Sequence, residues 1–238
     1  MHLKKYLLLI ALFIFTANTN TIAEASSNTA PALSAKQESI VTVSALTAQG
    51  DLARLKIALN TALDKKLTIN ELKEVLIQMY AYTGFPKSLN GLNTLMAVVE
   101  ERQANGVHDE LGRNASEVAP DRNRYEIGER NQTKLVGHPV QGKVYDFAPT
   151  IGVFLKEHLF GDIFERDVLD WQSRELATVG ALAGLYNVNP QLASHMKGSM
   201  NVGISERQLK EVIVVLTKNV DEKIGKNADT VLKEVLSK

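Results

Sequence analysis

Two stretches of the sequence repeat one helical pattern. Residues 72–76 (LKEVL) match residues 209–213 (LKEVI) at an offset of 137 (209 − 72). Each stretch follows a capping box, Thr68–Glu71 and Ser205–Gln208, in which a hydroxyl and a side chain three residues on bond each other's backbone amides. At the same offset Leu55, Leu59 and Leu67 fall on Leu192, Met196 and Ile204. This pattern predicts an internally duplicated unit of amphipathic helices.

The rest of the chain also favours helices. The helix that opens at Thr68 is broken at Gly84-Phe85-Pro86, and residues 87–102 resume a helical pattern. Residues 173–186 (SRELATVGALAGLY) are apolar nearly all round and rich in small residues, which predicts a buried, closely packed helix that could face a partner subunit. No segment alternates with the period of a strand, so we expect an all-α fold.

The N-terminus has the layout of a secretory signal peptide. Lys4 and Lys5 precede the apolar run 7–15 (LLLIALFIF), and Ala23-Glu24-Ala25 is a small-x-small cleavage pattern. The run is shorter than the roughly 20 residues of a bilayer span, so an uncleaved anchor is the weaker alternative. We therefore predict a signal peptide over residues 1–25 and a periplasmic or secreted protein, with no membrane partner after cleavage.

Composition divides the remaining chain into four segments. The Ser-, Ala- and Thr-rich residues 26–45 predict a flexible arm, and residues 46–102 form the first unit. Residues 103–150, rich in Gly, Asn, Pro and charge, predict a long connecting loop, which could be functional or reach another subunit. Residues 151–238 form the second unit.

Composition also excludes several classes of function. The chain has 27 basic and 27 acidic residues, which gives no general argument for a nucleic-acid partner. It has no cysteine, which excludes disulfides, thiolate-ligated metals and thiol catalysis. There is no Gly-rich phosphate loop, no Gly-x-Ser-x-Gly and no His-Glu-x-x-His. We expect no cofactor.

The densest polar cluster in apolar surroundings is Arg174-Glu175 followed by His195. From two adjacent helices, Glu175 could orient the imidazole of His195 as an acid/base, and Arg174 could bind a substrate carboxylate. The alternative, equally supported by sequence, is a charge pair at the start of a helix beside a structural histidine.

Other histidines and aromatic residues give weaker signals. His158 lies among apolar residues and could join a site or cap a packed turn, and Tyr82 and Phe85 could line an apolar pocket. His108 and His138 lie in polar loops with no second histidine at helical ligand spacing. A metal-dependent enzyme using these histidines is therefore the weakest hypothesis, and we predict no metal site.

Several short motifs resemble the carboxymuconolactone decarboxylase superfamily, which includes the alkylhydroperoxidase D type. Residues 72–90 resemble the end of one such unit, and residues 169–176 with His195, Met196 and Gly203 resemble the beginning of a second. The resemblance covers roughly residues 45–102 and 150–220. It implies an alkylhydroperoxidase D-like all-α fold of duplicated units, assembled as a homotrimer or homohexamer.

The resemblance also implies which chemistry is possible. The peroxidase type uses a Glu, a Cys-x-x-Cys pair and a His four residues later. Glu175 and His195 match the outer members, but Val188 and Gln191 occupy the cysteine positions, and Thr83 replaces a cysteine expected before Gly-Phe-Pro. Thiol peroxidase activity is therefore disfavoured.

Two hypotheses from different classes remain. The first is a cofactor-free lyase or isomerase acting on a small carboxylate or lactone. His195 would be its acid/base, Glu175 the orienting carboxylate and Arg174 the carboxylate anchor. Its pocket would be lined by Tyr82, Phe85, His158 and Trp171. The second is a non-catalytic binding or assembly protein on the same fold, consistent with the missing thiols and the export signal.

Overall fold

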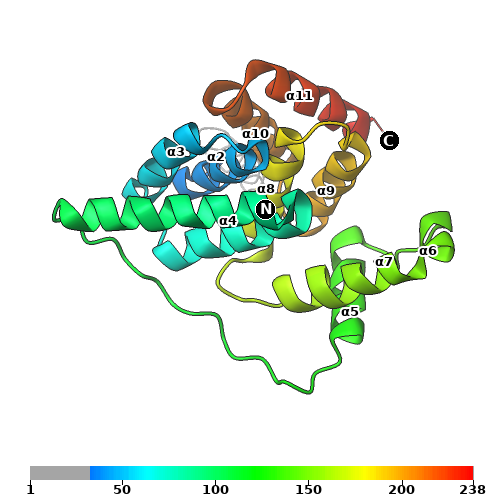
Figure 1. The fold of residues 1–238 in the computed structure, drawn as a ribbon. Coiled ribbons are helices and arrows are strands. Elements are labelled where there is room, and N and C mark those ends of the chain that lie inside the picture. Colours follow the sequence, from blue (N-terminus) through cyan, green and yellow to red (C-terminus); the bar gives the residue numbers. More distant parts are fainter. Residues whose placement is uncertain (1–32, 238) are drawn as a thin grey trace, which may run out of the picture. The chain divides into compact units, whose positions relative to one another are not determined.

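Residues 33–237 are described by a computed structural model, and every regular element among them is helical (Figure 1). The predicted signal peptide lies outside the described residues. The helices are α2 (Ala35–Gln49), α3 (Leu52–Asp64), α4 (Ile69–Ala104), α5 (Arg124–Val136), α6 (Lys143–Phe147), α7 (Pro149–Phe154), the π-helix η1 (Leu155–Ile163), α8 (Trp171–Gly184), α9 (Asn189–Asn201), α10 (Glu206–Asn219) and α11 (Glu222–Leu236). The expected all-α fold is confirmed.

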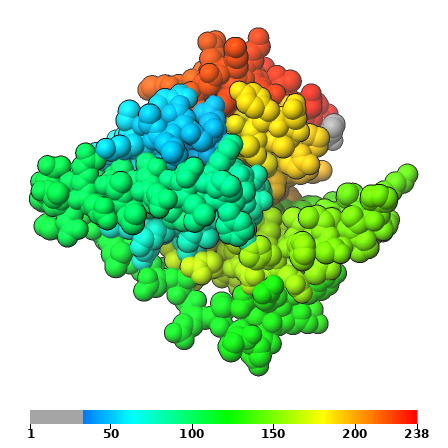
Figure 2. All heavy atoms as spheres, viewed as in Figure 1, coloured from blue at the N-terminus to red at the C-terminus, as the bar shows by residue number. Residues whose placement is uncertain are grey.

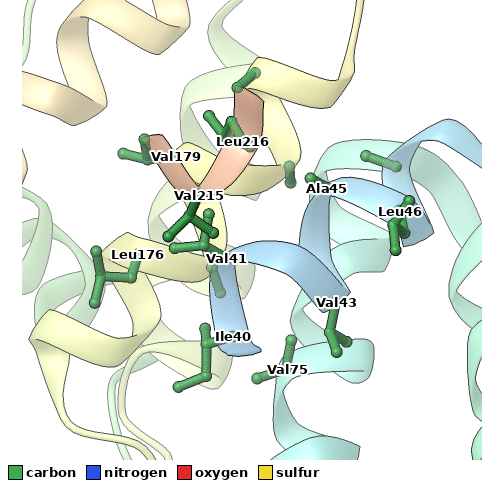
Figure 3. Close-up of a cluster of buried hydrophobic side chains, with 14 of the residues drawn as sticks. Ile40, Val41, Val43, Ala45, Leu46, Val75, Leu176, Val179, Val215 and Leu216 are labelled. Atoms are coloured by element: carbon green, nitrogen blue, oxygen red, sulfur yellow. The ribbon is translucent and has the colours of Figure 1, made fainter. Parts of the chain in front are cut away.

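The centre of the fold is the pair of helices α2 and α8. Both are buried along nearly their whole length, and α4 and α10 add apolar side chains to the same cluster (Figure 3). A smaller apolar cluster joins α5, η1 and the segment that follows η1. A helix buried on all sides has no polar face, so neither α2 nor the middle of α8 shows an amphipathic period.

The structure repeats itself at the offset found in the sequence. Helices α2, α3 and α4 correspond to α8, α9 and α10, and both capping boxes form at the starts of α4 and α10. The left-handed backbone positions repeat as well. Gly50 (φ 77°) pairs with Asn187 (φ 61°), and Lys66 (φ 68°) with Gly203 (φ 96°). The duplication therefore extends to the turns between helices.

The small residues of α8 allow α2 to approach closely. A Cβ added to Gly180 would lie 2.7 Å from the carbonyl oxygen of Val41, and one added to Gly184 would lie 2.7 Å from that of Ala45. These contacts are closer than real Cβ atoms make, so both positions require glycine in this packing. The small-residue face of α8 is covered by α2 of the same chain, not by a partner subunit.

Residues 35–45 differ from the predicted flexible arm, because they form most of the buried helix α2. Their hydroxyl groups bond back into the helix, as in Ser39 Oγ to the carbonyl of Ala35 and Thr42 Oγ1 to that of Glu38. A capping box between Ser34 and Gln37 opens the helix. The Ser- and Thr-rich composition predicted an arm because these hydroxyl groups can hydrogen-bond either water or the helix backbone, and composition does not distinguish the two.

Residues 103–150 are also more ordered than predicted, since they contain α5 and α6. Helix α5 is polar, and it packs on η1 through glycine: a Cβ on Gly128 would lie 1.7 Å from the carbonyl oxygen of Lys156. Because α5 buries mainly glycine and polar side chains, its sequence shows no apolar period from which the helix could be predicted. Residues 106–123 are irregular, and backbone bonds from Ile69 and Asn70 to Glu110 and Leu111 fix part of this segment.

The predicted break in the long fourth helix is present. Gly84 has φ 78° and ψ 161°, a conformation that side-chain-bearing residues rarely adopt, and Pro86 follows it. No helix within residues 33–237 is long and apolar enough to span a membrane.

Candidate functional site

The structure brings His195 of α9 and Glu175 of α8 into direct contact. His195 Nδ1 lies 3.0 Å from Glu175 Oε2 and 3.3 Å from Oε1. The Glu175 side chain is fully buried, while the imidazole is 16% exposed. An ionised carboxylate only accepts hydrogen bonds, so Nδ1 donates and a neutral imidazole presents Nε2 as a base. No other side chain in residues 33–237 hydrogen-bonds this carboxylate.

Tyr82 of α4 completes the cluster. Its ring meets the His195 ring edge to face, with centroids 5.7 Å apart, and its hydroxyl lies 3.2 Å from Thr178 Oγ1. Burial and then the negative charge of Glu175 raise the pKa of Tyr82 well above its usual range. Tyr82 therefore stays protonated at every physiological pH and can act only as a neutral hydrogen-bonding group beside the imidazole.

Arg174 does not join this cluster, although the sequence suggested it as a carboxylate anchor. Its guanidinium is fully buried, and it donates to Gln78 Oε1 (3.0 Å), Glu74 Oε2 (3.1 Å) and the carbonyl of Arg166 (2.6 Å). The prediction placed Arg174 beside Glu175 because they are adjacent in sequence. Successive helical residues point about 100° apart, so the two side chains leave α8 in different directions.

A buried polar network between α4 and α8 explains where Arg174 goes. Glu74, Gln78 and Tyr82 follow one another at intervals of four on α4, and Arg174 and Thr178 do so on α8. Gln78 Nε2 donates to both the carbonyl of Arg174 and Thr178 Oγ1, each at 2.9 Å. Sequence reasoning missed Glu74, Gln78 and Thr178, and the signal that could have found them was this spacing on two helices.

The ends of this network are charged. Burial opposes ionisation of Glu74, but hydrogen bonds and charges from Arg166 and Arg174 outweigh it and lower its pKa. Burial lowers the pKa of the Arg174 guanidinium, and the neighbouring Glu74 counteracts this. Since an unpaired buried charge is costly, Arg174 depends on Glu74, and Glu74 is neutralised by both arginines.

The remaining predicted pocket residues lie in two other places. Phe85 stacks on Tyr80 with ring centroids 4.5 Å apart, and His158 meets the same ring at 5.3 Å while its Nδ1 bonds Asp162. Trp171 packs against Phe164 and lies under the ammonium group of Lys134. Of the four predicted pocket residues, only Tyr82 contacts His195 directly.

The surface of residues 33–237 includes two cavities of a few hundred Å³. One, about 400 Å³, lies where α5 meets the segment before α8 and includes Trp171 and Lys134 in its wall. The other, about 330 Å³, lies among α2, α3 and α10. Neither wall includes His195 or Glu175. The imidazole is nevertheless 16% exposed, so solvent reaches the dyad.

No metal-binding arrangement is found within residues 33–237: no three His, Asp or Glu side chains converge there in a way that could hold an ion. His108 and His138 are both exposed, and His138 Nδ1 lies 3.2 Å from the carbonyl of Pro139.

Comparison with known families accounts for the repeated architecture. The sequence profile of the carboxymuconolactone decarboxylase family matches residues 15–96 and 149–217, which together are more than half of the chain. The chain belongs to this family. No curated protein matches the sequence.

The thiol positions of the peroxidase type can now be placed on this member of the carboxymuconolactone decarboxylase family. Val188 caps the N-terminus of α9 and Gln191 lies in its first turn, one turn before His195. Gln191 is exposed and Val188 is half-buried, so neither supplies a nucleophile. Glu175 on α8 and His195 on α9 are in direct contact, while residues 188 and 191 between them have no thiol chemistry.

Proposed function

We propose that this protein is a cofactor-free lyase or isomerase that moves a proton on a small lactone or carboxylate. The observation that supports it is the 3.0 Å contact between His195 Nδ1 and the buried Glu175 carboxylate. A carboxylate that holds Nδ1–H fixes the tautomer, orients the ring and stabilises the imidazolium that forms when Nε2 takes a proton.

The proposed reaction needs one group to accept and return a proton. Nε2 of His195 removes a proton from a carbon next to a carbonyl, and the electron pair of that C–H bond enters the enolate. In an isomerisation the imidazolium returns the proton to another carbon. In a decarboxylation His195 would start as the imidazolium. The C–C bond to the carboxylate breaks, its electron pair enters the enolate as carbon dioxide leaves, Nε2–H protonates the carbanion, and the neutral imidazole regains its proton from water.

Arg174 is left out of this proposal, since its guanidinium is fully buried and bound to Glu74 and Gln78. Tyr82 replaces it as the polar group beside the imidazole. A neutral hydroxyl next to the base can hydrogen-bond an enolate oxygen, which stabilises charge as it develops.

The test is proton exchange in deuterated water, followed by NMR on a panel of small lactones and keto- or enol-carboxylates. We expect wild-type protein to exchange or convert at least one compound. His195→Gln should lower the rate about 10²–10⁴-fold, the usual contribution of a general acid/base. Glu175→Gln should lower it less and shift the pH profile, because an amide does not stabilise the imidazolium. His138→Gln, in an exposed loop, is the matched control.

An equal rate in wild-type and His195→Gln protein would contradict the proposal. A panel on which wild-type protein converts nothing, although it binds members of the panel, would favour the second hypothesis, a binding or assembly protein on the same fold. The pairing of both Arg174 Nη atoms with Gln78, Glu74 and the carbonyl of Arg166 is the observation consistent with that hypothesis.

We also propose that the protein is a homotrimer or homohexamer. Helices α6 and α7 have no buried residue and protrude from the surface (Figure 2). Large apolar side chains on them are exposed, Phe147 at 91% and Phe154 at 60%. Apolar surface of this kind is typical of a protein–protein contact. Light scattering should give a mass of three or six chains, and Phe147→Glu should reduce it. A monomeric mass for the wild type would contradict this assembly.

Export to the periplasm or beyond is proposed from residues 1–25 alone. N-terminal sequencing of the protein from an extracytoplasmic fraction should begin near Ser26. A protein recovered only from the cytoplasm with Met1 retained would contradict it.

A further inference from the structure

The cavity among α2, α3 and α10 lies outside the His195 cluster, since its wall includes neither His195 nor Glu175. Its volume is about 330 Å³, at the lower end of the range of small-ligand pockets. Its walls combine carboxylate, hydroxyl, amide and cationic groups with apolar side chains. They include Glu38, Ser39, Thr42, Leu46, Arg54, Ile57, Ala58, Lys65 and Asn219.

This cavity is the counterpart of the His195 cluster in the other half of the chain. At the offset of 137, Glu38 corresponds to Glu175, Ala58 to His195 and Asn219 to Tyr82. The cluster takes its members from α8, α9 and α4, and the cavity takes the corresponding ones from α2, α3 and α10. The carboxylate is therefore retained, while both rings beside it are replaced by smaller side chains.

The replacements explain why a cavity is present. Ala58 has no atoms beyond Cβ where His195 has an imidazole, and Asn219 is much smaller than the tyrosine in the same position. Large-to-small changes leave space unless neighbouring elements collapse into it. Here α3 cannot move inward freely, because Leu55, Leu59 and Ala62 hold it in the core.

The retained carboxylate has lost its partner. Glu175 receives a hydrogen bond from an imidazole, whereas the Glu38 side chain has no hydrogen bond or ion pair within residues 33–237. The nearby hydroxyls of Ser39 and Thr42 donate to backbone carbonyls of α2 and are not available as donors. Arg54 is engaged with Asp51 and with the carbonyl of Val220. Glu38 is thus a half-buried carboxylate in the cavity wall that no side chain within residues 33–237 hydrogen-bonds, although the ammonium group of Lys65 lies in the same wall.

We propose that this cavity binds a small amine or imidazole that carries an apolar ring. Its cationic N–H group pairs with Glu38 and takes the place of the missing imidazole. The ring lies against Leu46, Ile57 and Ala58. This site is distinct from the His195 cluster and does not depend on the function proposed for that cluster.

The test uses benzylamine, with benzoate as a probe of similar size and opposite charge. Each is titrated into the full-length protein and followed by heteronuclear NMR. We expect benzylamine to bind with a millimolar Kd, to shift amide signals of α2, α3 and α10, and to bind at least tenfold more tightly than benzoate. Tighter binding of benzoate would overturn the proposal, since Lys65 and Arg54 would then determine the ligand's charge.

Two variants locate the site. Glu38→Gln should weaken benzylamine binding at least tenfold, while Glu100→Gln, an exposed carboxylate on α4 away from the cavity wall, should leave it unchanged. Ala58→His should fill the space, pair with Glu38 and abolish binding without lowering the melting temperature. Unchanged affinity in either Glu38→Gln or a folded Ala58→His protein would contradict the proposal.

Discussion

The two halves of the molecule use corresponding helix interfaces in opposite ways. Between α4 and α8, Gln78 and Thr178 are linked by hydrogen bonds, and Arg174 pairs with Glu74. At the offset of 137 the interface between α10 and α2 has valines in place of the first pair, Val215 and Val41, which lie together in the apolar cluster of Figure 3. The same backbone arrangement thus accepts either a polar network or an apolar contact.

This difference shows that the polar network is not needed to hold the helices together. An apolar contact at the equivalent place does so without the cost of burying charge, and buried ion pairs are seldom more stabilising than well-packed apolar residues. The network instead continues through Thr178 to the hydroxyl of Tyr82, whose ring contacts His195. We infer that the polar network serves the His195 site, whereas the contact between Val41 and Val215 serves packing.

The strongest test of this comparison removes the buried cation. Arg174→Met should lower the free energy of unfolding by about 3 kcal/mol, because Gln78 loses its buried donor and Glu74 keeps only Arg166 as a cationic partner. Its counterpart Gln37 lies in an exposed capping box, so Gln37→Met should cost less than about 1 kcal/mol. Urea denaturation of both variants measures the two values. Equal losses would show that the halves are energetically alike.

A smaller effect concerns the anion of the same pair. Glu74→Gln should cost about 2 kcal/mol at pH 7, because the amide keeps an acceptor but loses the charge. The pKa of Glu74 is lowered on folding from an ordinary value of 4.5, so its contribution is present above that pH and is lost as the pH falls through the folded pKa.

The difference between wild type and Glu74→Gln should therefore shrink below about pH 4.5. Denaturation at a series of pH values measures it. Glu211, the counterpart on α10, has no ion pair within residues 33–237, so Glu211→Gln should show no such dependence. A constant difference for Glu74→Gln down to pH 3 would mean that its carboxylate is not stabilised by the arginines.

The duplicated helical units were predictable because α3, α4 and α10 show apolar spacing and two of them begin with capping boxes. The contact between His195 and Glu175 was also anticipated from residue type and helix order. Helix α2 was not, because it is buried on all sides and its Ser and Thr residues give no period. Helix α5 was missed for the opposite reason, since it is polar and relies on glycine for close packing.

The hydrogen-bond partners of the Arg174 side chain could not be predicted from its neighbours in the sequence. Whether it faces Glu175 or Glu74 depends on its direction around α8 and on which helix packs there. The cavity beside Ala58 was hidden as well, because it results from what is missing relative to the other half. The offset of 137 contained the second answer, because it places Ala58 where the other half has His195.

The smallest expected difference lies in the two capping boxes. Thr68→Ala and Ser205→Ala should each lower the free energy of unfolding by about 1 kcal/mol, since each leaves a backbone amide of the first turn without its acceptor. Thr68→Ala should lower the free energy of unfolding slightly more than Ser205→Ala, because Thr68 is buried and Ser205 is exposed. Losses in the free energy of unfolding at distant sites are additive, so the double variant should lose the sum of the two single values to within about 0.5 kcal/mol. A double variant no less stable than either single one would mean that the repeated units do not unfold together.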